Sequence, residues 1–205
     1  HDTVKRFHDF KDALRKDVKN RARLCREEIE FVLAREDDCG VLMKQLEEGI
    51  LPLRVTHNDT KLNNILFDKN TGEGLCIIDL DTIMPGLAAN DFGDSIRFGA
   101  STAEEDEKDL NKVHFDIELY RIYVKGYLEM AKDVLTPAEN ASLPWGARLM
   151  TLECGMRFLA DFLQGDVYFK TTYPEHNLVR ARTQFRLVKE MEEQFDQMQE
   201  IVETF

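Results

Sequence analysis

The sequence predicts an α+β fold that is mainly helical and carries one small β-hairpin. Apolar residues recur at three- and four-residue spacing over most of the chain, as they do in amphipathic helices. Two short apolar runs, Ile65–Phe67 and Leu75–Ile78, flank a polar loop that contains glycine, which is the pattern of a β-hairpin. The 205 residues show no internal repeat, low-complexity segment or linker. We therefore expect one domain with a sizeable core.

The first quarter of the chain is predicted to be helical. An amphipathic pattern with a charged remainder covers residues 7–32 and predicts a helix, with an interruption allowed. Its apolar positions are Phe7, Phe10, Leu14, Val18, Cys25, Ile29 and Val32. A second helix is expected from Val41 to Gly49, because Gly49 and the following Pro52 are residues that end helices.

The segment from residue 53 to 99 contains the hairpin and the loops that flank it. Pairing of the two strands would bring Asn64, just before the first strand, beside Asp79, at the end of the second. Pro85-Gly86 predicts a turn, and residues 90–94 are expected to lead into a short helix.

Beyond residue 100 the prediction is wholly helical. One helix has an apolar face formed by Ile117, Tyr120, Val124, Tyr127 and Leu128. Residues 136–139 read Thr-Pro-Ala-Glu, a capping box with proline at the first helical position. The helix that follows is expected to extend to Gly165, although Pro144 and Gly146 could split its beginning. Residues 178–202 predict a long amphipathic helix that packs onto the same domain rather than a coiled coil, because its seam mixes aromatics and alanine.

Composition and charge limit the classes of partner. The chain has 43% hydrophobic and 32% charged residues, as ordinary folded proteins do. The formal net charge is −12, and no cluster of lysine and arginine is interleaved with aromatic residues, which argues against nucleic acid or an anionic membrane as a partner. No apolar run approaches the ~20 residues that cross a bilayer, and no signal peptide is recognisable. We expect a soluble, cytoplasmic protein.

The four cysteines follow no metal-ligand pattern. They are Cys25, Cys39, Cys76 and Cys154. Cys76 lies in a predicted strand and Cys154 in a predicted helix, so both are expected to pack as small hydrophobic residues. Their number does not exclude a disulfide, but the cytosol is the expected compartment.

Acid and amide side chains gather around the predicted hairpin. Asp59 precedes Asn64 by five residues, and Asp79 ends the second strand. A phosphoryl-transfer site needs these groups: one carboxylate orients and deprotonates a hydroxyl, while an amide and a second carboxylate hold the magnesium that neutralises the phosphates of ATP. Turn-capping Asn and Asp beside an ordinary hairpin is the alternative. The whole set is His57, Asp59, Lys61, Asn64, Asp79 and Asp81. Its density favours the functional interpretation.

The order His-x-Asp-x-x-x-x-Asn, hairpin, Asp resembles the catalytic half of the protein-kinase-like fold. Two positions differ from protein kinases. Asn58 stands where they carry arginine, and Ile78-Asp79-Leu80-Asp81 stands where they carry Asp-Phe-Gly. With these differences the chain resembles the superfamily of aminoglycoside phosphotransferases and choline kinases.

Within that superfamily the chain is most similar to the N-acetylhexosamine 1-kinases. The similarity lies in residues 56–61, 78–86, 155–161, 165–170 and 176–178. Such kinases phosphorylate the anomeric hydroxyl of GlcNAc or GalNAc, so the resemblance implies a small-molecule sugar as substrate, with ATP and Mg²⁺ as cofactors.

The resemblance implies a role for each residue around the hairpin. Asp59 is the catalytic base; because an ordinary carboxylate is a weak base, orientation of the hydroxyl contributes more than proton removal. Asn64 and Asp79 are the magnesium ligands, since hard oxygen donors suit this ion. Asp81 either assists the metal through water or caps the turn before Pro85.

Three further residues are expected to support the loop or the phosphate. His57 braces the loop through a backbone hydrogen bond, as the residue two before the base does in kinase-like folds. Lys61 either touches the transferred phosphate or is a solvated surface lysine. Asp94 anchors the backbone of the catalytic loop or N-caps the helix after it, and both can hold together.

Arg157 lies among apolar helical residues, and a buried arginine must be paired. One interpretation is an ion pair with Asp161, one helical turn away. The resemblance implies instead that Arg157 and Tyr168 line the sugar pocket, where a guanidinium and a phenol can bind hydroxyl and acetamido oxygens. Tyr173 and His176 are weaker candidates for the same pocket.

Other parts of a kinase are not visible in the sequence. There is no P-loop, and neither a glycine-rich hairpin nor a strand with a phosphate-pairing lysine precedes the catalytic loop. In the kinase fold those parts belong to the N-terminal lobe. Residues 1–205 are therefore expected to be the C-terminal, catalytic and acceptor-binding lobe alone, without the N-terminal nucleotide-binding lobe, and to be inactive as an isolated fragment.

Two other functions stay open. The nearest is a hydroxyl kinase for choline, homoserine or an aminoglycoside; choline would need an aromatic cage, which the only tryptophan, Trp145, does not make by itself. The other is a non-catalytic sugar-binding or protein-interaction domain. The complete set of Asp59, Asn64 and Asp79 argues against loss of activity by decay.

Overall fold

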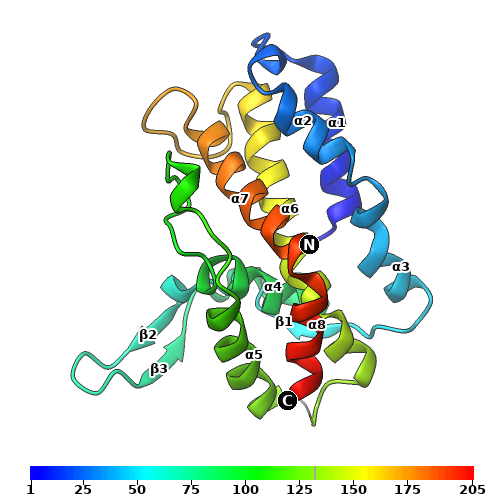
Figure 1. Cartoon of the computed structure of the whole chain (residues 1–205), viewed down its shortest axis with the longest axis vertical. Coiled ribbons are helices and arrows are strands. Elements are labelled where there is room, and N and C mark those ends of the chain that lie inside the picture. Colours follow the sequence, from blue (N-terminus) through cyan, green and yellow to red (C-terminus); the bar gives the residue numbers. More distant parts are fainter. Residues whose placement is uncertain (132) are drawn as a thin grey trace.

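The computed structural model describes residues 1–131 and 133–205. As predicted, the fold is α+β and mainly helical, with small antiparallel sheets (Figure 1). The described α-helices are α1 (Thr3–Lys16), α2 (Arg26–Leu33), α3 (Val41–Glu47), α4 (Ala88–Gly99), α5 (Ile117–Ala131), α6 (Pro137–Gln164), α7 (His176–Glu193) and α8 (Phe195–Thr204). The described strands are β1 (Arg54–Thr56), β2 (Ile65–Phe67), β3 (Gly74–Ile77) and β4 (Met84–Gly86).

Helix α6 is the central element of the molecule. The predicted capping box opens it: Thr136 Oγ1 accepts the backbone N–H of Glu139 at 3.2 Å, and the Glu139 carboxylate accepts the N–H of Thr136 at 2.8 Å. Helices α1, α4, α7 and α8 pack against α6 (Figure 1). Its apolar side chains therefore belong to both hydrophobic clusters, one shared with α1, α2 and α7 and the other with α4, α5 and α8.

Pro144 and Gly146 do not split α6, so that prediction is wrong. The reason for Gly146 is its close approach to α4. A Cβ added at Gly146 would lie 2.0 Å from the carbonyl oxygen of Ala89, and one added at Gly93 would lie 2.1 Å from the carbonyl oxygen of Gly146. The two glycines thus allow direct backbone contact between α4 and α6, and this contact fixes the position of α4.

The predicted hairpin is confirmed. Strands β2 and β3 are antiparallel, with Ile65 opposite Ile77 and Leu66 opposite Cys76. The hairpin projects from the helical body (Figure 1), and its side chains are largely exposed. Cys76 is accordingly exposed, so the prediction that it packs as a small hydrophobic residue is wrong.

Pro85-Gly86 does not form a turn, contrary to the prediction. It lies in β4, which pairs with β1 so that Val55 faces Pro85 and Thr56 faces Met84. Proline is tolerated because this ribbon has only two strands, both with a free edge. Gly86 is required by close approach, since a Cβ there would lie 2.3 Å from Thr56 Oγ1.

The N-terminal amphipathic pattern is interrupted, as the prediction allowed. Helix α1 ends at Asp17, which adopts the left-handed conformation with φ of 33°. A 3₁₀ turn at Ala22–Leu24 then leads into α2. Helix α3 ends near Gly49, whose φ is 72°, in agreement with the predicted end of that helix.

The prediction of one long helix over residues 178–202 is wrong. Gln194, with φ of −111°, separates α7 from α8. Met191 and Met198, on either side of the break, are both fully buried, so the apolar spacing continues across it. This continuity conceals the break in the sequence. The expectation of packing onto the same domain holds, because α8 contacts α5 and α6.

The four cysteines are free. Burial raises the pKa of Cys39 to about 12 and that of Cys25 to about 11, so both are unreactive thiols at neutral pH. Among the helices of the described residues, none has the length and hydropathy to cross a membrane.

Candidate active site

The loop between β1 and β2 is held by two acids on one face of α4. Asp91 accepts the backbone N–H groups of His57 at 2.7 Å and Asn58 at 2.8 Å. Asp94 accepts the N–H of Thr60 at 2.9 Å. Burial raises the pKa of Asp91, against the opposite effect of these two hydrogen bonds. Three loop residues, His57, Asn58 and Thr60, are thus held through their backbone N–H groups by α4.

Asp94 lies inside α4 rather than before it. The helix begins at Ala88, with Leu87 as N-cap, so the prediction that Asp94 N-caps the following helix is wrong. The Asp94 carboxylate instead pairs with Arg97, whose Nη2 lies 3.2 Å from Oδ1. Arg97 is itself buried and also binds Glu105 at 2.8 Å.

Asp91 is not among the site residues predicted from the sequence. Its signal was available: Asp91 and Asp94 are three residues apart and therefore share a helical face, one turn after a strand. The sequence prediction has residues 90–94 leading into the helix, whereas α4 begins at Ala88. The shared helical face of the two acids is therefore not apparent in that prediction.

Asp59 lies at the exposed edge of the loop and is held by two donors. Asn64 Nδ2 and Lys61 Nζ each lie 2.8 Å from Asp59 Oδ2, and the same amide of Asn64 donates to the carbonyl of Asp59 at 2.8 Å. Burial alone would raise the pKa of Asp59, but hydrogen bonds from Lys61 and Asn64 outweigh it and the pKa is lowered. Asp59 is therefore an ionised, pre-oriented carboxylate at neutral pH.

The hairpin brings Asp79 to the same place. The N–H of Ile78 donates to the carbonyl of Asn64 at 2.9 Å, so the residue before Asp79 pairs with the predicted metal ligand. Asp79 adopts the left-handed conformation, with φ of 64°. The charge of Asp59 acts on Asp79, which places the two carboxylates in one electrostatic neighbourhood.

Asp79 and Asp81 form a pair of close, exposed carboxyl groups. Interaction with Asp81 is the main cause of the raised pKa of Asp79, since two neighbouring negative charges oppose ionisation. In the described structure Asp81 accepts no backbone hydrogen bond, so nothing supports the turn-capping alternative. Oxygen atoms of Asp79, Asp81 and Asn64 are a donor set that fits a hard divalent cation such as Mg²⁺.

These acids do not form a ready-made protein cage. Within the described residues no group of three or more His, Cys, Asp or Glu side chains is arranged to hold a metal ion. A magnesium site with one amide, one or two carboxylates and substrate phosphate oxygens needs no such cage.

His57 joins the two chain segments of the site. Its Nε2 lies 3.0 Å from the carbonyl oxygen of Ile78, and its own carbonyl accepts the hydroxyl of Thr82 at 2.6 Å. Both contacts are made to the segment that contains Asp79. His57 therefore links the loop to the segment that follows β3.

Arg157 and Tyr168 lie together, on a cavity of about 390 Å³ between α1 and α6. The Arg157 guanidinium is 5.7 Å from the ring centroid of Tyr168 and 5.4 Å from that of Phe169. The cavity is lined by Arg6, Asp9, Asp12, Lys16, Arg157, Ala160, Asp161, Gln164, Tyr168 and Phe169. Neither Tyr173 nor His176 is among them; their rings stack on each other at 4.4 Å.

Asp161 is not the ion-pair partner of Arg157. Its buried carboxylate accepts the backbone N–H groups of Val167, Tyr168 and Phe169 at 2.8–3.0 Å. It also accepts the amide of Asn177 at 2.8 Å. Asp161 thus shapes the loop that presents Tyr168, and the helix-surface ion pair considered from the sequence is not formed.

The helix that bears Arg157 is connected to the loop that contains Asp59 through Glu153 and His1. Glu153 lies four residues before Arg157 on α6, about 6 Å along the axis. Its carboxylate is 2.9 Å from His1 Nδ1, and His1 Nε2 is 3.2 Å from the carbonyl oxygen of Asn58. The His1 side chain therefore bridges α6, which bears Arg157, and Asn58, the residue before Asp59.

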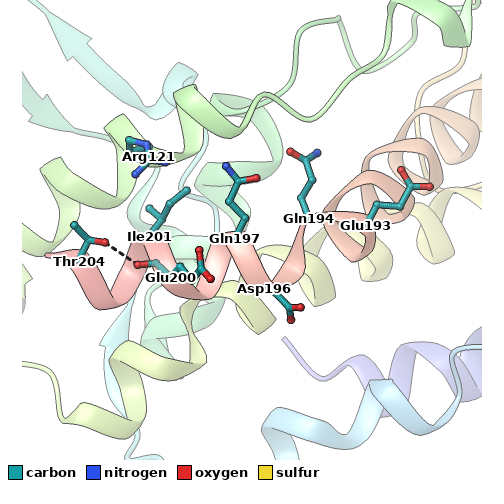
Figure 2. A pocket seen from close by; sticks show the side chains of 8 residues that line it. All are labelled: Arg121, Glu193, Gln194, Asp196, Gln197, Glu200, Ile201 and Thr204. Atoms are coloured by element: carbon teal, nitrogen blue, oxygen red, sulfur yellow. Dashed lines mark hydrogen bonds between the residues drawn. The ribbon is translucent and has the colours of Figure 1, made fainter.

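A larger cavity, about 510 Å³, lies between α5 and α8 and contains none of the predicted site residues (Figure 2). Its lining residues are Arg121, Glu193, Gln194, Asp196, Gln197, Glu200, Ile201 and Thr204. It holds three acids against one arginine, and nothing in it matches the chemistry around Asp59.

The site geometry agrees with a comparison to known protein families. The model of the phosphotransferase enzyme family, APH, matches residues 1–132 of the 205, well over half of the chain. The chain belongs to this phosphotransferase family. The matched part contains the catalytic loop, the hairpin and α4. The phosphotransferase is expected to act on a small molecule, and members of its family generally use ATP and Mg²⁺.

Proposed function

We propose that this phosphotransferase transfers the γ-phosphoryl group of ATP, with Mg²⁺, to a sugar hydroxyl, and that its acceptor is the anomeric hydroxyl of an N-acetylhexosamine such as GlcNAc or GalNAc. One observation carries the proposal. Asp59 is held by Lys61 and Asn64 on a loop anchored to α4, and the hairpin brings Asp79 to the same edge.

Asp59 orients the acceptor hydroxyl in this proposal. Both side-chain donors bind Oδ2, and in the described part of the chain Oδ1 receives no hydrogen bond. Oδ1 is thus the oxygen that can accept the hydroxyl proton. Because the pKa of Asp59 is lowered, positioning of the nucleophile contributes more than proton removal.

Lys61 and the metal ligands manage the phosphate charge. The ammonium of Lys61, 2.8 Å from Asp59, lies where it can contact the transferred phosphoryl group. Asn64 uses its Nδ2 on Asp59, which leaves Oδ1 as a metal ligand beside Asp79, with Asp81 acting directly or through water. When bound, Mg²⁺ would neutralise the negative charge that builds on the phosphates.

The cavity beside Arg157 and Tyr168 is the proposed acceptor site. Its three cationic residues, Arg6, Lys16 and Arg157, are matched by three acids, Asp9, Asp12 and Asp161, so it lacks the acidic excess that a polycationic aminoglycoside would favour. An arginine stacked on aromatic rings suits the hydroxyl and amide oxygens of a neutral sugar.

Choline is a weaker candidate for the acceptor. The ring of Trp145 packs edge-on against Phe195 at 5.0 Å, and its face carries the guanidinium of Arg148 at 4.9 Å. The tryptophan is therefore occupied by protein groups and is not free to build a cage for a quaternary ammonium.

We further propose that residues 1–205 are the catalytic and acceptor-binding lobe of a cytoplasmic kinase whose nucleotide-binding lobe lies on the hairpin side. Large apolar side chains are exposed there over a short stretch, as expected of a surface that a partner or ligand covers. They are Leu53, Val55, Leu66, Phe67, Leu75, Ile77, Ile78, Leu80, Ile83 and Met84, each at least 37% exposed.

An acceptor panel tests the proposal. Residues 1–205 are titrated by calorimetry with GlcNAc, GalNAc, choline, homoserine and an aminoglycoside, beside a coupled assay for ADP. We expect weak hexosamine binding that Arg157→Ala removes, and no turnover by this chain alone. Preferred binding of another acceptor would overturn the sugar assignment, and robust turnover would overturn the two-lobe assignment.

A further inference from the structure

The side chain of His1 lies between two acceptors that come from distant parts of the chain. Nδ1 is 2.9 Å from Glu153 Oε1 on α6, and Nε2 is 3.2 Å from the backbone oxygen of Asn58. A carboxylate and a carbonyl oxygen can only accept hydrogen bonds. Both contacts can therefore be satisfied only when both ring nitrogens carry a proton, that is, by the imidazolium.

The surroundings of His1 fix its position. Its side chain is 14% exposed, and that of Glu153 is 1% exposed. Thr3 donates its hydroxyl to the other carboxylate oxygen of Glu153 at 2.9 Å. Asp2, between them in the chain, N-caps α1 by accepting the N–H of Lys5. The packing of α1 on α6 thus holds the imidazole against the loop.

The peptide that His1 touches is the one that leads into Asp59. The carbonyl of Asn58 and the N–H of Asp59 belong to the same peptide plane, so a hydrogen bond to that carbonyl constrains the orientation of Asp59. Asn58 has a left-handed backbone, with φ of 63°, and its N–H is already held by Asp91. Asp91 therefore holds Asn58 by its N–H, and His1 holds it by its carbonyl.

We propose that His1, as an imidazolium bridging Glu153 and the carbonyl of Asn58, is a positioning residue for Asp59 and makes the geometry of the catalytic loop depend on pH. The inference rests on the proposed role of Asp59. Loss of the proton removes one of the two hydrogen bonds and sets a ring lone pair against an oxygen. The loop then loses its link to α6.

The charges around His1 favour the protonated form. Burial would lower its pKa, but the hydrogen bond and charge of Glu153 outweigh this, and the pKa is raised above the ordinary value of 6.5. Other charged groups face the bridge as well: Asp91 and Asp94 from α4, and Arg6 from α1, which acts on Glu153. The bridge is thus favoured while His1 is protonated and is lost as pH rises through the pKa of His1.

Nuclear magnetic resonance on residues 1–205 tests the proposal without any need for catalysis. The ring C–H shifts of His1 report its protonation, and the ¹⁵N shift of the Asp59 amide reports the hydrogen bond on the other side of the same peptide. We expect His1 to titrate above 6.5 and the Asp59 resonance to move with the same midpoint.

Three variants sharpen the test. His1→Gln should abolish the titration of the Asp59 resonance, and Glu153→Gln should shift its midpoint to lower pH. His8→Gln, a substitution of an exposed histidine on α1, should change neither. The proposal is overturned if His1 titrates at or below 6.5, or if the Asp59 resonance follows pH equally in the His1→Gln protein. Failure of the intact kinase, with its nucleotide-binding lobe, to phosphorylate a sugar would overturn the proposed function and leave the NMR result intact.

Discussion

At the residue scale, the site depends on backbone conformations that most side chains resist. Asn58 and Asp79 have φ values of 63° and 64°, and both belong to the residue types that tolerate the left-handed region best. Asn58 directly precedes Asp59, and Asp79 itself carries one of the candidate carboxylates. The N–H of Asn58 donates to Asp91, and His57 Nε2 contacts the carbonyl of Ile78, the residue before Asp79; these contacts hold the two conformations in place.

Asp59→Asn tests the proposed base. We expect kcat in the intact protein to fall by about 10²–10⁴-fold, because the carboxylate acts mainly in the transition state, while ATP affinity stays nearly unchanged. Steady-state kinetics and nucleotide titration measure the two effects. Asp37→Asn, at an exposed position, serves as the control. Near wild-type turnover of Asp59→Asn would remove this residue from its role.

A second pair of substitutions separates the two acids of the metal site. Asp79→Ala should abolish magnesium-dependent nucleotide binding, since the proposed direct ligand is lost. Asp81→Ala should weaken it by only about 10-fold, as expected for a group that acts through water. Calorimetric titration of Mg²⁺ and nucleotide measures both. Equal losses in the two variants would show that the assigned asymmetry is wrong.

At the scale of elements, contact between α4 and α6 sets the position of the site. Helix α4 carries Asp91 and Asp94, which hold the loop that contains Asp59. The point at which α4 contacts α6 therefore decides where this loop lies. That crossing depends on Gly93 and Gly146, whose missing Cβ atoms allow backbone contact. Neither residue touches the loop.

Gly93→Ala tests this crossing. The added Cβ would meet backbone atoms, which cannot rotate away as a side chain can. Overpacking typically costs about 1–3 kcal/mol, and we expect Gly93→Ala to lower the free energy of unfolding by at least the larger of these values. Gly126→Ala in α5 is the matched control, because nothing lies within 4 Å of a Cβ there. It should gain up to about 1 kcal/mol through helix propensity. Urea unfolding compares the two, and equal stabilities would contradict the close-contact argument.

At the scale of the whole molecule, buried and half-buried glutamates join segments that are far apart in the sequence. Glu139 binds Arg54 at 2.7 Å, and Glu192 binds Arg35 at 2.6 Å. Glu153 binds His1. Residues separated by 85 or more positions are thereby tied together around α6.

These glutamates predict how stability depends on pH. Burial works against ionisation of Glu153 and Glu192, and hydrogen bonds and charges from their partners outweigh it; for Glu139 the hydrogen bond from Arg54 dominates. All three pKa values are lowered from 4.5. A lowered pKa means that the unfolded state binds more protons, so the free energy of unfolding should fall as pH drops below about 4.5.

Urea unfolding between pH 7 and pH 3 measures this dependence. Glu192→Gln should reduce the slope of stability against pH, whereas Glu47→Gln, at an exposed position, should not. An unchanged slope in Glu192→Gln would mean that the ion pairs of Glu192 with Arg35 and Arg148 contribute no net stability.

The sequence by itself determined the features that depend on near neighbours. Periodicity and capping residues predicted most helices, alternating apolar runs and a glycine loop predicted the hairpin, and the spacing of Asp59, Asn64 and Asp79 identified the candidate site. Tertiary structure alone decided the rest: Pro85-Gly86 became a strand because β1 was available to pair with it, and the C-terminal helix breaks at Gln194. The anchoring of the loop by Asp91 and the bridge from His1 to Glu153 also required the folded chain. These contacts join residues 33 to 152 positions apart, and local pattern carries no information about partners at that distance.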